Sequence, residues 1–317
     1  MEAEFPQMGG WIVDKLEKYC GVIPAFYACY DDGGKVSADR TRALARHLVT
    51  KGVKGLYVGG SSGECIYLEK EERMRMLEAV MAEVGGECTS IAHVACNNTE
   101  ESCELAAHAE SLGVDAIASI PPIYFHLPDY AIAQYWNDMS SAAPNTDFII
   151  YNIPQLAGVA LSVSLFKEMR KNPRVIGVKN SSMPAQDIQG FVAAGGENCV
   201  VFNGPDEQFI AGRVIGAKGG IGGTYAAMPE LFLKMDELVK AGRIIEAQPI
   251  QHEVNGIIAD LCSCHGNMYA VIKKVLEINE NVLCGSVHRP MPGLIDADMP
   301  KVNAVAARIR AAIKEYC

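Results

Sequence analysis

Two side chains that could form and process a covalent intermediate with a ketone end consecutive apolar stretches of the chain. Lys179 ends RVIGVK at 174–179, and Tyr151 ends DFIIY at 147–151. A lysine among apolar neighbours loses hydration, which disfavours the ammonium and lowers the pKa. The free amine can attack a ketone to give a Schiff base, and a nearby tyrosine can move the proton that such chemistry requires. Alone, each residue also fits an ordinary role, a solvated strand end or a tyrosine bonded to the backbone.

Strand-like and helix-like segments alternate along the first 242 residues and predict the elements that position these side chains. Eight consecutive strand–helix units with short connections are typical of a closed (β/α)8 TIM barrel. A doubly wound open sheet is the alternative, but no G-x-G-x-x-G pattern follows the first strand. Strands are predicted at residues 21–27, 55–60, 89–95, 114–121, 147–154, 174–180, 199–204 and 218–224.

The last part of the chain, residues 243–317, has helical periodicity throughout. We therefore expect a barrel with a short N-terminal extension at residues 1–242, and a helical region at 243–317 that packs on the barrel. No flexible linker of low complexity separates the two parts.

The carboxyl ends of barrel strands carry the catalytic groups of TIM barrels, so residues after each predicted strand become candidates. Neighbouring strands lie about 4.8 Å apart, which lets Tyr151 and Lys179 reach one substrate. The turn that contains Ser61 and Ser62 could hold a carboxylate through its N–H groups and hydroxyls, although an ordinary turn is an equal alternative. Glu64 is expected to be structural and to bond nearby backbone.

Composition narrows the function classes. The 317-residue chain has a net charge of −10, which argues against binding to nucleic acid or to an anionic membrane surface. It shows neither a signal-peptide pattern nor an apolar window of about 18 residues, so we expect a cytoplasmic protein. Its 11 cysteines include no CxxC pair, which is typical of reduced thiols. The cluster at 262–265, CSCH, lacks the further ligands of a zinc site, and we predict no metal and no cofactor.

Five motifs resemble those of the N-acetylneuraminate lyase and dihydrodipicolinate synthase superfamily. They are YVGGSSGE at 57–64, YNIPQLAGVALS at 151–162, IGVKNSS at 176–182, NGPDEQF at 203–209 and GGIGGTY at 219–225. The resemblance implies a (β/α)8 barrel with C-terminal helices, class I aldolase chemistry through a lysine–pyruvate Schiff base, no metal, and a homotetramer.

The resemblance also implies a role for individual residues. Lys179 resembles the Schiff-base nucleophile, and Tyr151 resembles the proton shuttle. The positions that resemble substrate contacts are Ser61 and Ser62, which match a pair gripping the pyruvate carboxylate; Ser181, a hydroxyl lining the pocket; Gly204, a backbone contact; Asp206 and Glu207, acceptors for sugar hydroxyls; Gly223; and Tyr124, which matches a tyrosine reaching into a neighbouring subunit's site.

Three positions bear on the substrate. Leu156 stands where dihydrodipicolinate synthases typically have an arginine that holds a second carboxylate, which favours the lyases. Gly223 and Ala226 depart from the lyase pattern GGIGSTYN, so one hydrogen bond of about 1 kcal/mol could be missing. We expect cleavage of N-acetylneuraminate to N-acetylmannosamine and pyruvate. The alternatives are an aldolase for another 2-keto-3-deoxy acid, an enzyme like dihydrodipicolinate synthase, and a barrel that binds a ligand without turnover.

Overall fold

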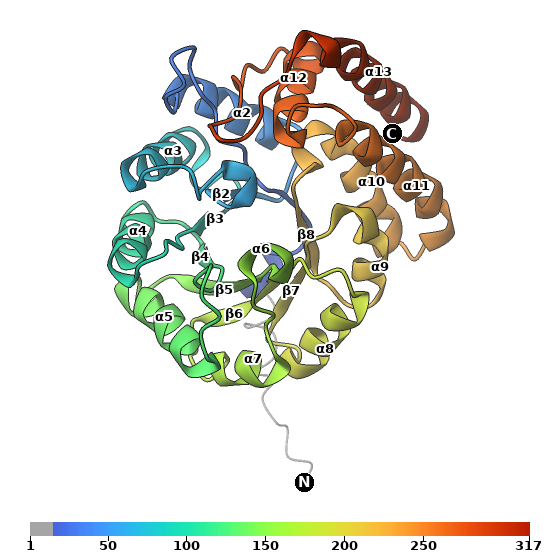
Figure 1. Cartoon of the computed structure of the whole chain (residues 1–317). Coiled ribbons are helices and arrows are strands. Elements are labelled where there is room, and N and C mark those ends of the chain that lie inside the picture. The colour runs from blue at the N-terminus through green and yellow to red at the C-terminus, as the bar shows by residue number, and fades with distance from the viewer. Residues whose placement is uncertain (1–14) are drawn as a thin grey trace.

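Eight parallel strands form a barrel in the computed structural model, which describes residues 15–317 (Figure 1). The strand order is β1-β8-β7-β6-β5-β4-β3-β2, and a bridge between Ala25 and Tyr57 joins the two edges. The predicted TIM barrel is confirmed. The strands are β1 (Val22–Pro24), β2 (Gly55–Val58), β3 (Thr89–His93), β4 (Ala116–Ser119), β5 (Asp147–Asn152), β6 (Val175–Asn180), β7 (Val200–Asn203) and β8 (Gly219–Gly222).

A ring of helices surrounds the strands, as Figure 1 shows. The sequence did not predict the short helix α6 (Pro154–Ala157), which follows β5 and ends at Gly158 with a φ of 74°. The outer helices are α2 (Ala38–Thr50), α3 (Lys70–Val84), α4 (Thr99–Ser111), α5 (Asp129–Ala142), α7 (Val163–Met169), α8 (Ala185–Gly195), α9 (Phe209–Val214) and α10 (Pro229–Lys240).

Two apolar layers hold the barrel together. One fills its interior and includes Ile91, Ile149 and Ile221, while the other lies between the strands and the surrounding helices. Every strand residue is buried, because helices cover the outer face and side chains fill the inner one. A lysine at a strand end therefore lies in a dry environment unless a loop opens to solvent.

The predicted helical region contains α11 (Ile244–Leu261), α12 (Met268–Glu280) and α13 (Met299–Tyr316). Their buried residues belong to the apolar layer that also covers the outside of the barrel. The helices therefore pack on the barrel, while a division into two domains at residue 242 stays a prediction. The first 14 residues of the predicted N-terminal extension lie outside the described part of the chain. None of the helices within residues 15–317 has the length and apolar character needed to cross a bilayer.

Candidate active site

Lys179 and Tyr151 are paired across β5 and β6, as the sequence predicted. The Lys179 Nζ atom lies 3.8 Å from the centroid of the Tyr151 ring and 4.6 Å from that of Tyr57. Burial lowers the pKa of Lys179 to about 7, an effect that the nearby Asp206 carboxylate opposes. A large fraction of Lys179 is consequently a neutral amine at pH 7, and a neutral amine is the form that attacks a carbonyl.

Aromatic rings around Lys179 explain why water is excluded from its amine. The ring centroids of Tyr57, His93 and Tyr151 lie 5.8 to 6.2 Å from one another inside the barrel, toward the carboxyl ends of the strands. Burial, together with the cations Arg73 and Lys179, holds the pKa of His93 well below its usual range. His93 is therefore neutral and adds no second cation beside the lysine.

Close contact between β6 and β7 brings Lys179 to this position. A Cβ atom on Gly177 would collide with the backbone oxygen of Val200, so only glycine lets the two strands pair here. All six residues of β6 are buried, Lys179 included, so its amine lies near the carboxyl end of a strand with no other ionisable side chain.

Tyr151 is held as a protonated phenol. Burial raises its pKa to about 12, and the neighbouring hydroxyls of Ser61 and Ser181 oppose the rise. The contacts bring together three of the predicted hydroxyl-bearing residues: Tyr151 in β5, Ser61 after β2 and Ser181 after β6. A protonated tyrosine between two hydroxyls can pass a proton along a hydrogen-bonded chain.

The two predicted carboxylate-binding serines lie in a tight turn after β2. Ser61–Gly63 forms one turn of 3₁₀ helix. Gly59 precedes it with a φ of 76°, a conformation that favours glycine. Ser62 is buried and its Oγ lies 3.0 Å from the hydroxyl of Tyr269.

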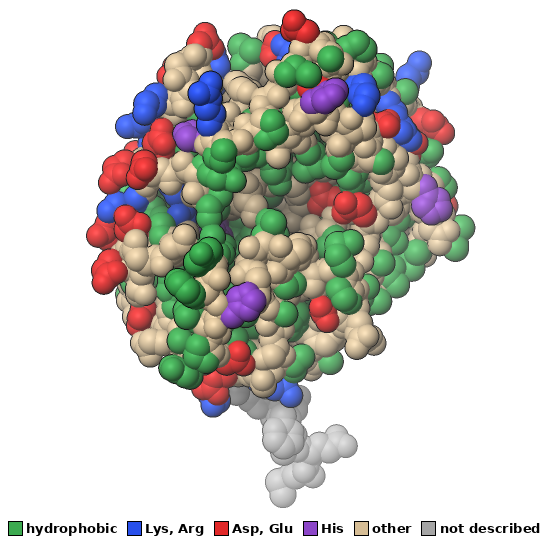
Figure 2. Space-filling model, viewed as in Figure 1, with side chains coloured by type: hydrophobic (Ala, Val, Ile, Leu, Met, Phe, Trp, Pro, Cys, Tyr) green, Lys and Arg blue, Asp and Glu red, His purple; other side chains and the backbone are tan. Residues whose placement is uncertain are grey.

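Asp206 and Glu207, both predicted to bind sugar hydroxyls, lie in different environments. Asp206 is buried, and its Oδ2 accepts hydrogen bonds from the Thr224 N–H and hydroxyl, both at 2.6 Å. Burial raises the pKa of Asp206 to about 6, against the effects of Thr224 and Lys179. Glu207 is exposed. Figure 2 shows acidic side chains in the hollow at the centre of this face.

Two predicted glycine contacts occupy crowded positions. A Cβ atom on Gly204 would collide with Ser181 Oγ, so the loops after β6 and β7 touch there. A Cβ atom on Gly223 would lie 3.2 Å from the Tyr269 hydroxyl and 3.4 Å from Ser62 Oγ. Both glycines therefore border hydroxyl groups of the candidate site.

Sequence reasoning missed Tyr269. It is the second residue of α12, more than 40 residues after β8, and therefore falls outside any search of strand ends. The only sequence signal is a tyrosine in the first turn of a predicted helix, which is a common feature of apolar helices. Its place in the site follows from how the C-terminal helices pack on the barrel.

Tyr124 does not join the cluster around Lys179 within the described chain. It lies in the loop after β4 with a φ of 78°, and its side chain is 87% exposed. Its ring packs edge to face on Phe125, 5.1 Å away. Leu156, on α6, lines the mouth of the site and is 65% exposed.

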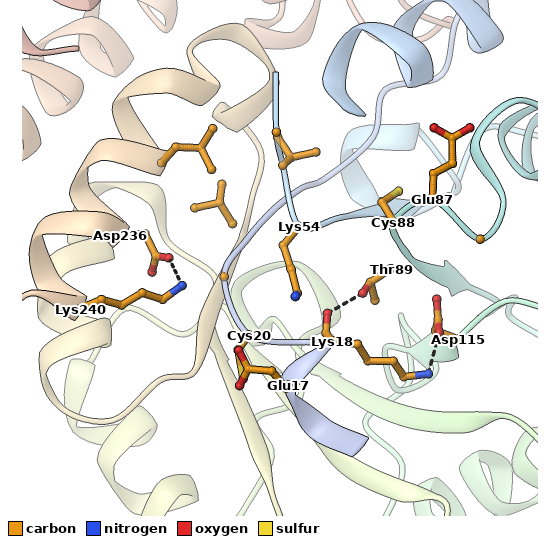
Figure 3. A pocket seen from close by; sticks show the side chains of 16 residues that line it. Glu17, Lys18, Cys20, Lys54, Glu87, Cys88, Thr89, Asp115, Asp236 and Lys240 are labelled. Carbon is orange, nitrogen blue, oxygen red and sulfur yellow. Dashed lines mark hydrogen bonds and ion pairs between the residues drawn. The ribbon is translucent and has the colours of Figure 1, made fainter. Parts of the chain in front are cut away.

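Two cavities lie at opposite ends of the barrel. The one beside the candidate residues has a volume of about 610 Å³ and is lined by Ser61, Leu156 and Tyr269, among others. Figure 3 shows the other, of about 550 Å³, at the amino ends of the strands. There Lys18 pairs with Asp115, and Lys240 pairs with Asp236. Of these two cavities, the first is lined by one predicted site residue, Ser61, and the second by none.

The CSCH cluster at 262–265 is engaged in other contacts. His265 Nδ1 lies 2.9 Å from Asp298 Oδ1, which joins the loop before α12 to the start of α13. Across residues 15–317, no group of three or more His, Cys, Asp or Glu side chains is arranged to hold a metal ion.

Comparison with known proteins places the chain in a family. The model of the dihydrodipicolinate synthetase family matches residues 18–309. An N-acetylneuraminate lyase of Mediterraneibacter gnavus is 64% identical over 95% of this chain and 96% of its own length. One of Citrobacter koseri is 32% identical over 91% and 96%. The wild-type sialic acid aldolase of Ruminococcus gnavus superposes with a TM-score of 0.94 at 64% identity, over 95% of this chain and all of that one. This chain belongs to the dihydrodipicolinate synthetase family.

Proposed function

We propose that this protein is a Schiff-base aldolase that cleaves N-acetylneuraminate to N-acetylmannosamine and pyruvate. The observation that carries the proposal is the buried Lys179, with a pKa of about 7, in contact with Tyr151 at the carboxyl end of a TIM barrel. The relatives named N-acetylneuraminate lyase, at 64% and 32% identity, support the choice of substrate.

The proposed reaction begins when the Lys179 amine attacks the C2 ketone of the open-chain sugar acid. Loss of water gives an iminium, which withdraws electrons from the C3–C4 bond. Tyr151 takes up the proton of the 4-hydroxyl as its own proton moves into the chain of neighbouring hydroxyls. The C3–C4 bond breaks, the aldehyde leaves, and the electron pair remains as an enamine on Lys179. The proton removed from the 4-hydroxyl returns through Tyr151 to C3, and hydrolysis of the resulting iminium by water releases pyruvate and restores the amine.

The remaining predicted residues bind the substrate in this proposal. Ser61 and Ser62 hold the carboxylate beside the ketone, and Ser181 and Gly204 line the pocket at the reacting carbons. The acceptors for the sugar hydroxyls are Asp206 and Glu207. Leu156 presents an apolar surface at the mouth where a second carboxylate would need a cation, which disfavours a dihydrodipicolinate synthase reaction.

Borohydride reduction in the presence of pyruvate tests the covalent step. We expect one pyruvate-derived adduct, which peptide mass spectrometry locates on Lys179. The trapping rate should rise with pH through about 7, because the amine must lose its proton before it attacks. The matched variant is Tyr151→Phe, which should still form the adduct but lose about 10² to 10⁴ of its cleavage rate. No adduct, or an adduct on another lysine, would contradict the proposal.

A substrate panel separates this reaction from its alternatives. N-acetylneuraminate, 2-keto-3-deoxygluconate and 4-hydroxy-2-oxoglutarate share the 2-keto acid end and differ beyond C4. Negligible release of pyruvate from N-acetylneuraminate, with fast release from another member, would assign a different aldol substrate. Adduct formation without turnover of any of the three would favour a barrel that only binds its ligand.

We also propose that the protein is a cytoplasmic homotetramer in which Tyr124 reaches a neighbouring subunit's site. Tyr124, Phe125 and Tyr130 are 87%, 70% and 79% exposed, and neighbouring exposed aromatic side chains are typical of protein contact surfaces. Light scattering should give a mass near four chains for the wild type. Tyr124→Ser together with Phe125→Ser should shift the mass toward smaller species and lower turnover. An unchanged mass distribution would place the interface elsewhere.

A further inference from the structure

We propose that Tyr269 is a positioning residue that holds the Ser62 hydroxyl ready for the substrate carboxylate, and that Gly223 provides the space that Tyr269 needs. The inference rests on the proposed function, because it assumes that Ser62 binds the carboxylate of a 2-keto acid. It brings the C-terminal helical region into the substrate site.

The Tyr269 side chain is fixed from several sides. Its N–H donates to Asn267 Oδ1 at 2.9 Å, at the start of α12. Its ring lies 5.8 Å from the ring of Tyr27, whose hydroxyl donates to the Gly223 backbone oxygen at 2.5 Å. The Tyr269 hydroxyl accepts a hydrogen bond from Ser62 Oγ at 3.0 Å. Tyr269 therefore joins the loops after β1, β2 and β8 at the wall of the cavity.

Proton counting shows how Tyr269 would act through Ser62. A serine hydroxyl has one proton to donate and lone pairs to accept with. In the structure Ser62 donates to Tyr269, and in that arrangement it cannot also donate to a carboxylate. When a bound carboxylate accepts from Ser62 instead, the Tyr269 hydroxyl can rotate to donate to Ser62, and the two bonds strengthen one another. Burial raises the pKa of Tyr269, which keeps its proton available.

The space that the Tyr269 hydroxyl needs explains why position 223 is a glycine. Its backbone is not among those with a positive φ, so the conformation does not require glycine there. A Cβ atom would lie 3.2 Å from the Tyr269 hydroxyl. A serine at position 223 would place its own hydroxyl in the region that the Tyr269 hydroxyl occupies. The two positions are alternative sources of one hydroxyl, and in this chain α12 supplies it instead of the loop after β8.

Saturation curves measured by pyruvate–borohydride trapping test the inference. Tyr269→Phe keeps the ring and removes the hydroxyl. The half-saturating pyruvate concentration and the KM for N-acetylneuraminate should both rise about five- to tenfold, since a hydrogen bond that supports a charged group weakens. The kcat should stay within about twofold, and the pH midpoint of trapping should not move, because Lys179 keeps its surroundings.

The control for loss of a buried tyrosine hydroxyl is Tyr19→Phe. Its hydroxyl bonds the Asp115 backbone oxygen and Asp147 Oδ2, near the amino ends of the strands. This variant should leave both saturation constants unchanged. Circular dichroism confirms that each variant is folded before it is assayed.

Rescue separates a positioning role from a merely structural one. Gly223→Ser should raise both saturation constants by crowding Tyr269, whereas Gly223→Ser combined with Tyr269→Phe should recover part of the loss of Tyr269→Phe alone. Saturation constants equal to those of the wild type in Tyr269→Phe, or strictly additive losses in the double variant, would overturn the inference. In either case, adduct formation by the wild-type protein would still support the proposed function. If wild-type protein formed no adduct with pyruvate, the proposed function itself would fail, and the inference with it.

Discussion

Replacement of Lys179 by methionine is expected to abolish pyruvate trapping and to lower cleavage by at least about 10⁴-fold, because the covalent route is lost. Methionine has a similar length and no amine, so it fills the same apolar space. Steady-state assays of pyruvate release measure the loss. Residual activity within about tenfold of wild type would show that another group carries the chemistry.

The same substitution is expected to stabilise the fold at neutral pH. Burial lowers the pKa of Lys179 from 10.5 to about 7, so the folded state binds its proton less tightly than the unfolded state does. Below about pH 7 both states hold the proton, and the folded state bears the full cost. Between about pH 7 and 10.5 only the unfolded state holds it, so wild-type stability rises with pH; above that range the cost disappears.

The size of this effect is large for one side chain. One pKa unit corresponds to about 1.4 kcal/mol, so Lys179→Met should raise the free energy of unfolding by roughly 3 to 5 kcal/mol near pH 7. The gain should decline toward pH 10.5. Urea unfolding at several pH values measures it. The control is Lys171→Met, since Lys171 is an exposed lysine paired with Glu168. A gain independent of pH would contradict this explanation.

The second large effect concerns the buried ion pair between Glu64 and Lys273. Their side chains are fully buried, and Nζ lies 2.6 Å from Oε1. Glu64 Oε2 also accepts from the Tyr30 hydroxyl at 3.0 Å and from the His288 N–H at 2.6 Å. Lys273→Met leaves a buried carboxylate without its cation and should cost about 3 to 5 kcal/mol of unfolding free energy.

A double variant distinguishes the lost pair from a general packing defect. Glu64→Gln combined with Lys273→Met removes both charges, so it should be more stable than Lys273→Met alone. Urea unfolding of the wild type, of Glu64→Gln and Lys273→Met separately, and of the double variant completes the double-mutant cycle. Lys274→Met is the matched control, because Lys274 and its partner Glu277 are both partly exposed to solvent and the change should cost less than about 1 kcal/mol. If Lys273→Met lost less than about 1 kcal/mol of unfolding free energy, the buried pair would contribute little to stability.

The central pair of the site could be predicted because it depends on short-range sequence features. Apolar runs ending in Tyr151 and Lys179 define two consecutive strands, and parallel pairing of consecutive strands brings their ends together. Strand limits were less accurate: β1 is Val22–Pro24, shorter than the predicted 21–27. The backbone around it continues into a bridge with Tyr57 and into loop contacts that no local pattern encodes.

Features that depend on distant packing could not be predicted. Glu64 was expected to be structural, and it is, but the backbone N–H that it binds belongs to His288. Its cation and the Tyr269 hydroxyl come from the same face of α12, one turn apart. A helix periodicity identifies α12 as apolar on one side and says nothing of the loop that this side covers.

The ion pair of Glu64 also has a consequence for the order in which the chain is made. During synthesis the turn that carries Ser61 and Ser62 emerges more than 200 residues before Lys273. A nascent barrel that already contains all eight strands still has Glu64 without its cation and Ser62 without Tyr269. The turn that carries Ser61 and Ser62 can therefore reach its final geometry only after α12 has left the ribosome, and completion of the candidate site is one of the last events in the folding of this protein.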